Sequence, residues 1–116
     1  MSDSIRVTTD ILGKAAAHMR RNFNEIKDIE CIGSCAKFSF RNKTFVIEEI
    51  NTLQYFVQLY VDEVSYYCNF KMTQLGYKTE YHDDVHDLHR RLCAETANNS
   101  IDEVLGPDFF ETITKG

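Results

Sequence analysis

Between Ala36 and Met72, apolar and polar side chains alternate in four short runs that are separated by turn residues. Alternation with a period of two is typical of strands that bury one face. The runs cover residues 36–41, 44–50, 53–61 and 64–72, with Asn42 and the pair 62–63 at two of the breaks. The pattern therefore predicts a four-stranded antiparallel meander.

Residues 52–75 also fit a helical spacing of apolar side chains, with Gly76 in the position of a C-terminal cap. Tyr, Phe, Val and Cys dominate this stretch, however, and these residue types favour pleated surfaces. We therefore interpret it as two strands, and a β-hairpin followed by one long central helix over 52–75 is the alternative.

The segments on either side of the meander have helical patterns. Thr8 or Thr9 can cap a first helix that runs to about Ile26, and residues 1–8 before it are where we expect disorder. The apolar positions of this helix recur at three- and four-residue spacing: Ile11, Leu12, Ala15, Ala16, Met19, Phe23 and Ile26.

A second helix is predicted from His82, and the pair 98–99 (Asn-Asn) is expected to end it. Residues 100–103 (SIDE) have the form of a capping box that opens a short final helix. A last turn around Phe109, Phe110 and Ile113 is expected to fold back onto the core. Together these elements predict one α+β domain over 1–116, with a short helical tail. Its order of elements is similar to that of small secretion-chaperone-type domains, a similarity of layout that implies no function.

Charge and cysteine content restrict the class of protein. The chain has 13 Lys and Arg against 18 Asp and Glu, a net charge of −5, which repels phosphate backbones and makes nucleic acid an unlikely partner. The apolar runs are too short for a membrane span, and no secretory signal is evident at the N-terminus. We therefore predict a cytoplasmic protein with no membrane partner, whose four cysteines are reduced thiols.

One group of residues has the chemistry of metal ligands. Three of the four histidines lie in eight residues, and His82, His86, His89 and Cys93 fall on one helical stripe. A single ion can be shared only by neighbours, so the predicted ligands are His86, His89 and Cys93, with zinc as the candidate metal. Further ligands would come from other cysteines: Cys31, Cys35 or Cys68. The alternative is that the histidines border the buried face formed by Val85, Leu88 and Leu92.

No catalytic residues are predicted. Residues 82–86 (HDDVH) resemble the zinc-protease pattern H-E-x-x-H, but Asp83 replaces the glutamate and is one methylene shorter. Three residues separate Cys31 from Cys35, whereas redox pairs and zinc knuckles typically have two, so small buried side chains are the preferred interpretation. We therefore expect a protein that is not an enzyme.

The meander also predicts a surface. If its strands bury alternate residues, the outer face carries aromatic side chains among basic ones, a combination that is typical of binding surfaces. The candidate partner-binding residues are Phe56, Tyr60, Tyr67, Lys37, Arg41 and Lys71.

Three hypotheses about function follow. The first is a small non-catalytic protein-binding module of the adaptor, chaperone, immunity or inhibitor type, with homodimerisation through an exposed sheet face or edge as part of it. The second is a metal-dependent enzyme or sensor that uses the histidine and cysteine stripe. The third is a single-stranded nucleic-acid binder that uses the outer aromatics and the pair 20–21 (Arg-Arg).

Overall fold

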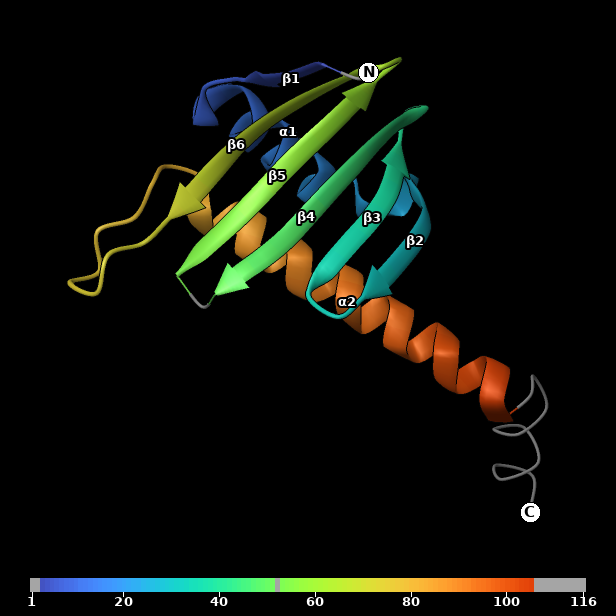
Figure 1. Cartoon of the computed structure of the whole chain (residues 1–116). Helices are drawn as coiled ribbons and strands as arrows, with labels where there is room; N and C mark the ends of the chain where they lie inside the picture. The colour runs from blue at the N-terminus through green and yellow to red at the C-terminus, as the bar shows by residue number, and fades with distance from the viewer. Residues whose placement is uncertain (1–2, 52, 106–116) are drawn as a thin grey trace.

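In its described residues, the chain folds as an α+β structure with two helices and one six-stranded, mostly antiparallel sheet (Figure 1). The computed structural model describes residues 3–51 and 53–105, with 97–105 as helix backbone. The elements follow in the order β1 (Asp3–Arg6), α1 (Thr9–Arg21), the 3-10 turn η1 (Phe23–Glu25), β2 (Ile26–Ile32), β3 (Cys35–Phe40), β4 (Lys43–Asn51), β5 (Gln54–Val61), β6 (Val64–Lys71) and α2 (His82–Leu105).

The predicted meander is confirmed and forms the centre of the sheet. Strands β3 to β6 are consecutive antiparallel neighbours in the strand order β1-β6-β5-β4-β3-β2. The turn between β3 and β4 places Arg41 (φ 51°) and Asn42 (φ 65°) in the left-handed region, as a tight two-residue hairpin requires. Asp62 (φ 56°) does the same between β5 and β6, since aspartate tolerates this conformation. The alternative of one helix over 52–75 is wrong.

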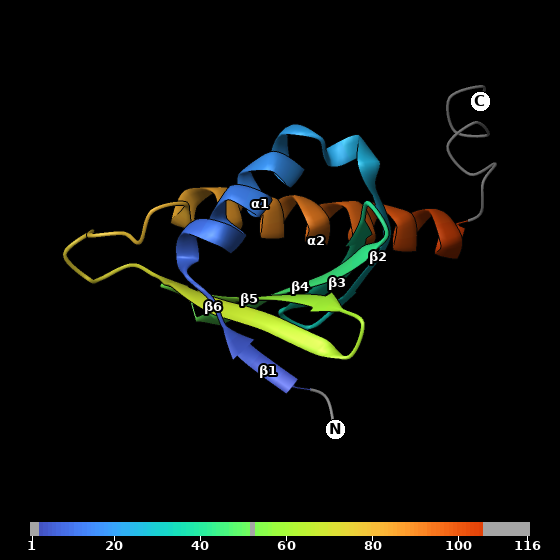
Figure 2. The same cartoon turned by 90° about the horizontal axis from the view of Figure 1, so that it is seen from above.

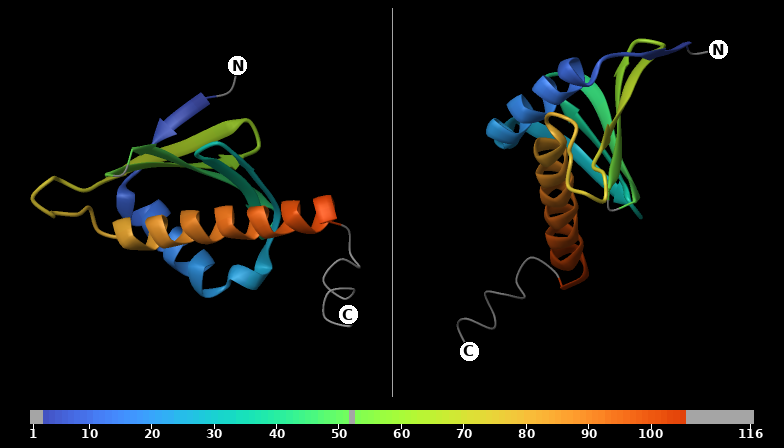
Figure 3. Two further views of the ribbon diagram at one scale, coloured as in Figure 1. Left: turned by 90° about the horizontal axis from the view of Figure 1, so that it is seen from below. Right: turned by 90° about the vertical axis from the view of Figure 1, so that its left-hand side faces the viewer.

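The molecule has two layers. Both helices lie on one face of the sheet, and in the described residues the opposite face has no helix over it (Figure 2; Figure 3). Arg20 of α1 joins the two helices through ion pairs to Asp84 (2.9 Å) and Asp87 (2.8 Å) of α2. In the part of the chain that is described, neither helix is long and apolar enough to cross a membrane.

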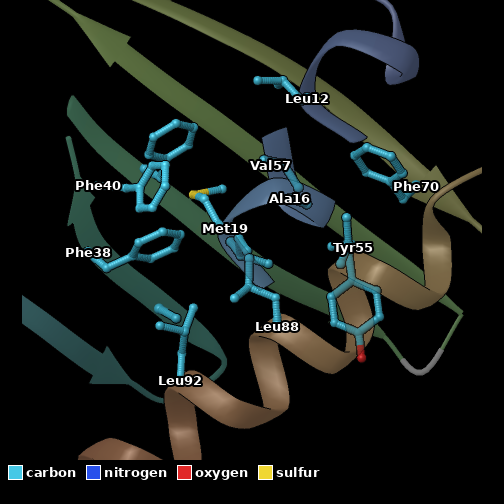
Figure 4. Close-up of a cluster of buried hydrophobic side chains, with 14 of the residues drawn as sticks. Leu12, Ala16, Met19, Phe38, Phe40, Tyr55, Val57, Phe70, Leu88 and Leu92 are labelled. Carbon is cyan, nitrogen blue, oxygen red and sulfur yellow. The ribbon is translucent and has the colours of Figure 1, made fainter. Parts of the chain in front are cut away.

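The core fills the space between the helices and the sheet. Figure 4 shows the two helices contributing Leu12, Ala16, Met19, Leu88 and Leu92, and the sheet contributing Phe38, Phe40, Tyr55, Val57 and Phe70. The predicted buried face of the second helix is confirmed, because Val85, Leu88 and Leu92 are fully buried. The stripe of the first helix is only partly buried, since Ile11 is 56% exposed.

The first helix is shorter than predicted. It ends at Arg21, because Asn22 closes the last turn with its backbone N–H and its side-chain amide, both donating to the carbonyl of His18. The chain then makes the turn η1 and enters β2 at Ile26, a strand that was not predicted. A bulge lies between Lys27 and Glu30 of this strand, where Asp28 has a φ of 55°.

The N-terminal prediction is also wrong in part, because residues 3–6 form β1 rather than a disordered segment. β1 pairs in parallel with β6, with Ile5 opposite Tyr66 and Arg6 opposite Tyr67. All four of its residues are exposed, so it has no burial pattern by which a strand could be recognised.

The second helix is longer than predicted. It continues through the Asn-Asn pair and the predicted capping box to Leu105 as one element. Asn and Ser each cost a helix only a few tenths of a kcal/mol, whereas starting a new helix requires a costly nucleus. The predicted turn around Phe109, Phe110 and Ile113 lies outside the described residues.

Candidate functional site

The open face of the sheet carries the aromatic residues that the sequence placed there. Tyr55 and Val57 are buried against the helices, so Phe56 and Tyr60 on the same strand project to the opposite side. Tyr67 is assigned to that side by the same argument, because its neighbour Cys68 is 1% exposed in the core. We call the side opposite the helices the open face.

The aromatic side chains of the open face lie close together. The rings of Phe56 and Tyr67 are 5.6 Å apart and tilted by 44°. Gln58 is the cross-strand partner of Tyr67, and it also accepts a hydrogen bond of 3.1 Å from the hydroxyl of Tyr60. The three aromatics therefore form a continuous strip along β5 and β6, in which Tyr60 is 38% exposed.

A shallow depression adjoins the strip. It is lined by Lys37, Thr44, Val46 and Tyr60. Val46 is only 8% exposed, although it lies outside the main core, because its neighbours on the open face cover it. Sequence reasoning missed Val46. The signal that could have found it is its place in the predicted meander, opposite Lys37 on one neighbouring strand and Gln58 on the other.

The three basic residues predicted for the surface lie in different parts of the sheet. Lys37 lies in the middle of β3 and is exposed, and Lys71 lies at the end of β6 opposite Gln54. Arg41 lies in the β3–β4 turn, where its guanidinium donates two hydrogen bonds of 3.1 Å to the carboxylate of Glu25. This ion pair lowers the pKa of Glu25 and ties Arg41 to η1 rather than to the aromatic residues of the open face.

The charge of the open face differs from that of the whole chain. Arg6 lies beside Tyr67, and Lys37 and Lys71 add two further positive charges. Glu30 beside Lys37 and Glu48 beside Phe56 supply the negative ones. Together these side chains are slightly basic, whereas the whole chain has a net charge of −5.

The histidines of α2 surround one tyrosine. The ring of Tyr55 is 5.6 Å from His82, 5.6 Å from His86 and 5.5 Å from His89, with all three pairs close to edge-on. The Tyr55 hydroxyl shares a hydrogen bond with Nδ1 of His86. Burial raises the pKa of Tyr55, and the nearby carboxylate of Glu49 raises it further. The stripe therefore lies against a core aromatic that the spacing alone did not reveal.

The predicted metal ligands have other bonding partners. Nε2 of His89 is 2.9 Å from the carbonyl oxygen of Ser34, so this nitrogen carries a proton and donates it. A metal there would displace that bond, and a metal at Nδ1 of His86 would displace Tyr55. Among the described residues, no group of three or more His, Cys, Asp or Glu is arranged to hold a metal ion. Metal binding by His86, His89 and Cys93 stays a prediction.

The cysteines divide into a pair and two separate thiols. Sγ of Cys93 is 3.5 Å from Sγ of Cys31 and 3.9 Å from Nε2 of His89. Burial raises the pKa of Cys93 to about 11, helped by the hydrogen bond to Cys31. Cys35 is half-buried and Cys68 is buried, and burial raises the pKa of both thiols. The prediction of small buried side chains holds only in part for Cys31 and Cys35, which are both half-buried.

Among the described residues, His82 and Ser65 are buried polar side chains without a hydrogen-bond partner. His82 is 4% exposed, and neither ring nitrogen has a hydrogen-bond partner. Its Nδ1 lies 3.9 Å from a carboxylate oxygen of Asp83, which is too long for a hydrogen bond. An apolar side chain at this position would remove the desolvation cost of the imidazole.

Replacing His82 and His86 by leucine is expected to change stability in opposite directions. His82→Leu raises the free energy of unfolding by about 1 kcal/mol, because an unpartnered polar group leaves the core. His86→Leu lowers it by about 1 kcal/mol, because the hydroxyl of Tyr55 loses its partner. Equilibrium urea unfolding of both variants measures the two changes, and changes of the same sign contradict this account of the cluster.

Comparison with known proteins gives no match. No family model fits the chain, and no curated protein or solved structure is similar enough to count as one. The site must therefore be interpreted from its own geometry.

Proposed function

We propose that the protein is a small cytoplasmic, non-catalytic protein-binding module that docks its partner on the open face of the sheet. The observation that carries this proposal is the position of both helices on one side, which leaves an aromatic strip without a covering element in the described residues (Figure 2). Phe56, Tyr60 and Tyr67 form this strip, and aromatic side chains dominate the energetic centres of protein interfaces.

The chemistry of the face favours one kind of partner. Its centre is aromatic and aliphatic, through Phe56, Val46 and the ring of Tyr67, whereas Lys37 and Lys71 lie to either side. A protein surface with an apolar centre and flanking carboxylates complements this arrangement, because opposite charges at the rim favour encounter and orientation. An adaptor, chaperone, immunity protein or inhibitor can act in this way without a catalytic group.

The two other hypotheses have less support. A metal-dependent activity needs ligands that instead bond to Tyr55 and Ser34. A single-stranded nucleic acid would find stacking rings on the open face, but it would also meet an acidic chain. A second copy of the chain is the remaining protein partner, and sedimentation analysis of the purified protein distinguishes it from a heterologous one.

The experiment uses Tyr67→Asp as the test and Ile11→Asp as the matched control. Ile11 is 56% exposed on α1, so both changes place a carboxylate on the surface but on opposite sides of the molecule. The tagged protein is used to capture its partner from the native host, and the captured protein is purified and titrated calorimetrically. Tyr67→Asp is expected to weaken binding about 30-fold, the effect of losing a central interface residue.

Ile11→Asp is expected to bind as the wild type does, and circular dichroism should show both variants folded. Wild-type affinity in Tyr67→Asp, or a loss that is equal in both variants, contradicts docking on the open face. Binding of oligonucleotides that falls steeply with salt would favour the nucleic-acid hypothesis instead.

A further inference from the structure

Two cysteines that are far apart in the sequence meet between the sheet and α2. Cys31 of β2 and Cys93 of α2 are 62 positions apart, and their sulfur atoms lie 3.5 Å from each other. Cys31 is the cross-strand partner of Ala36, which is fully buried in the core, so its side chain faces the helices. The pair thus connects an edge strand to the longer helix.

The geometry of the pair suits a disulfide. A disulfide has a sulfur–sulfur distance of about 2.0 Å, so the two atoms need to approach by about 1.5 Å from their present separation. Rotation about the Cα–Cβ bonds moves the two sulfur atoms over distances of this order. Both residues are half-buried rather than fully enclosed, so a small oxidant can reach them.

A hydroxyl group lies beside one of the two sulfurs. Oγ1 of Thr96 is 3.4 Å from Sγ of Cys31 and 3.0 Å from the carbonyl oxygen of Leu92. The single hydroxyl hydrogen can point to either acceptor. When Cys31 is a thiolate, its charge makes it the stronger acceptor, and the hydroxyl stabilises it. This contact favours Cys31 as the first thiol to react, because burial raises the pKa of the Cys93 thiol to about 11.

We propose that Cys31 and Cys93 form a reversible disulfide when the protein meets a peroxide. The thiolate of Cys31 attacks one oxygen of hydrogen peroxide, so a sulfur–oxygen bond forms, the oxygen–oxygen bond breaks, and hydroxide leaves. That hydroxide takes the proton that Cys31 released and becomes water. The sulfur of Cys93 then attacks the sulfenic sulfur, the sulfur–oxygen bond breaks, and the second hydroxide takes the proton of Cys93.

The sum of these steps balances. Two thiols lose two electrons and two protons in total, one peroxide is reduced, and two water molecules form. A dithiol such as dithiothreitol reverses the reaction by thiol–disulfide exchange and is itself oxidised. The proposal does not depend on the docking function, because the pair lies on the helix side of the sheet.

The other two cysteines are poorly placed to compete. Cys35 lies between Ser34 and the buried Ala36 on β3, so its side chain points to the open face and away from Cys31. Cys68 is 1% exposed on β6, which is separated from β2 by three strands. Cys35→Ser therefore serves as a matched control for substitutions in the pair.

The experiment treats the reduced full chain with hydrogen peroxide, blocks the remaining thiols by alkylation, and analyses non-reduced peptides by mass spectrometry. The expected product is a cross-linked peptide that contains Cys31 and Cys93, in the wild type and in Cys35→Ser. Cys31→Ser and Cys93→Ser should not yield it. The melting temperature of the oxidised wild type should rise by about 10 °C, because the bond closes a long loop, and dithiothreitol should reverse the rise.

Detection of the wild-type peptide does not depend on whether a variant folds. Sulfinic or sulfonic acid at either thiol without a cross-linked peptide overturns the proposal, as does a disulfide between Cys31 and Cys35. Stoichiometric zinc that copurifies with the reduced protein and protects Cys31 and Cys93 from alkylation also overturns it, because the pair would then be a metal site.

Discussion

Leu88→Ala is expected to lower the free energy of unfolding by about 2–5 kcal/mol. Leu88 has no exposed surface, and it extends from α2 into the layer between the helices and the sheet (Figure 4). Met19 of α1 and Tyr55 of β5 belong to the same buried cluster. Truncation leaves a cavity between α2 and the sheet that the surrounding structure fills only in part, and equilibrium urea unfolding measures the loss.

Leu75→Ala is the matched control for this truncation. Leu75 is 87% exposed in the loop between β6 and α2, and the substitution removes the same atoms. Its cost is expected to be below about 0.5 kcal/mol, since exposed side chains contribute little to stability. Similar losses for the two variants would mean that α2 does not pack on the sheet through Leu88.

Gly13→Ala is expected to destabilise the protein by about 1–3 kcal/mol. In most helices this exchange is favourable, because alanine has the higher helix propensity. Here a Cβ atom on residue 13 would lie 2.5 Å from Cδ2 of Tyr81 and 2.7 Å from its Cβ. Tyr81 packs against the core and its carbonyl oxygen accepts the N–H of Val85, so its ring has little room to withdraw.

The clash can be separated from other effects by a double-mutant cycle. Without the side chain, in a Tyr81→Gly background, Gly13→Ala should stabilise the protein by up to about 1 kcal/mol, the ordinary gain in helix propensity. Thermal and urea unfolding of the four proteins give the coupling energy. An equal cost of Gly13→Ala in both backgrounds contradicts the contact between α1 and the residue before α2.

The central strands could be predicted because their burial repeats without interruption. From Tyr55 to Tyr60, every second side chain enters the core, and the register with β6 continues the same alternation. The two faces of the meander therefore follow from the sequence, and with them the positions of Phe56 and Tyr67. Alternation along the strand also placed Arg41 on the open face. The left-handed turn at this residue instead brings its guanidinium to Glu25.

The boundary between α1 and β2 could not be predicted, because Phe23 of η1 and Ile26 of β2 continue the helical spacing of apolar residues after the helix ends. Ile26 and Ile29 are both at least half-buried on the same strand, yet they are three residues apart, as they would be on a helical face. The extra residue is absorbed at Asp28, whose positive φ is a property of the folded backbone rather than of the local sequence. The apolar spacing of Phe23 and Ile26 therefore continued the predicted helix about five residues beyond Arg21.

The histidine stripe shows a different limit. Its spacing correctly predicted that His82, His86 and His89 share one side of a helix. The spacing did not predict their contact with Tyr55, which lies more than twenty residues earlier in the chain. All three imidazoles pack against its ring. Long-range packing of this kind leaves no local pattern, and it determines whether a histidine serves as a ligand or as part of the core.

The two edges of the sheet have a consequence for the behaviour of the protein at high concentration. One edge is β1, which has only four residues, and the other is β2, which is bent by its bulge at Asp28. Short and irregular edges offer a poor template for another chain to extend the ladder of hydrogen bonds. Growth of fibrils by successive strand addition is therefore disfavoured.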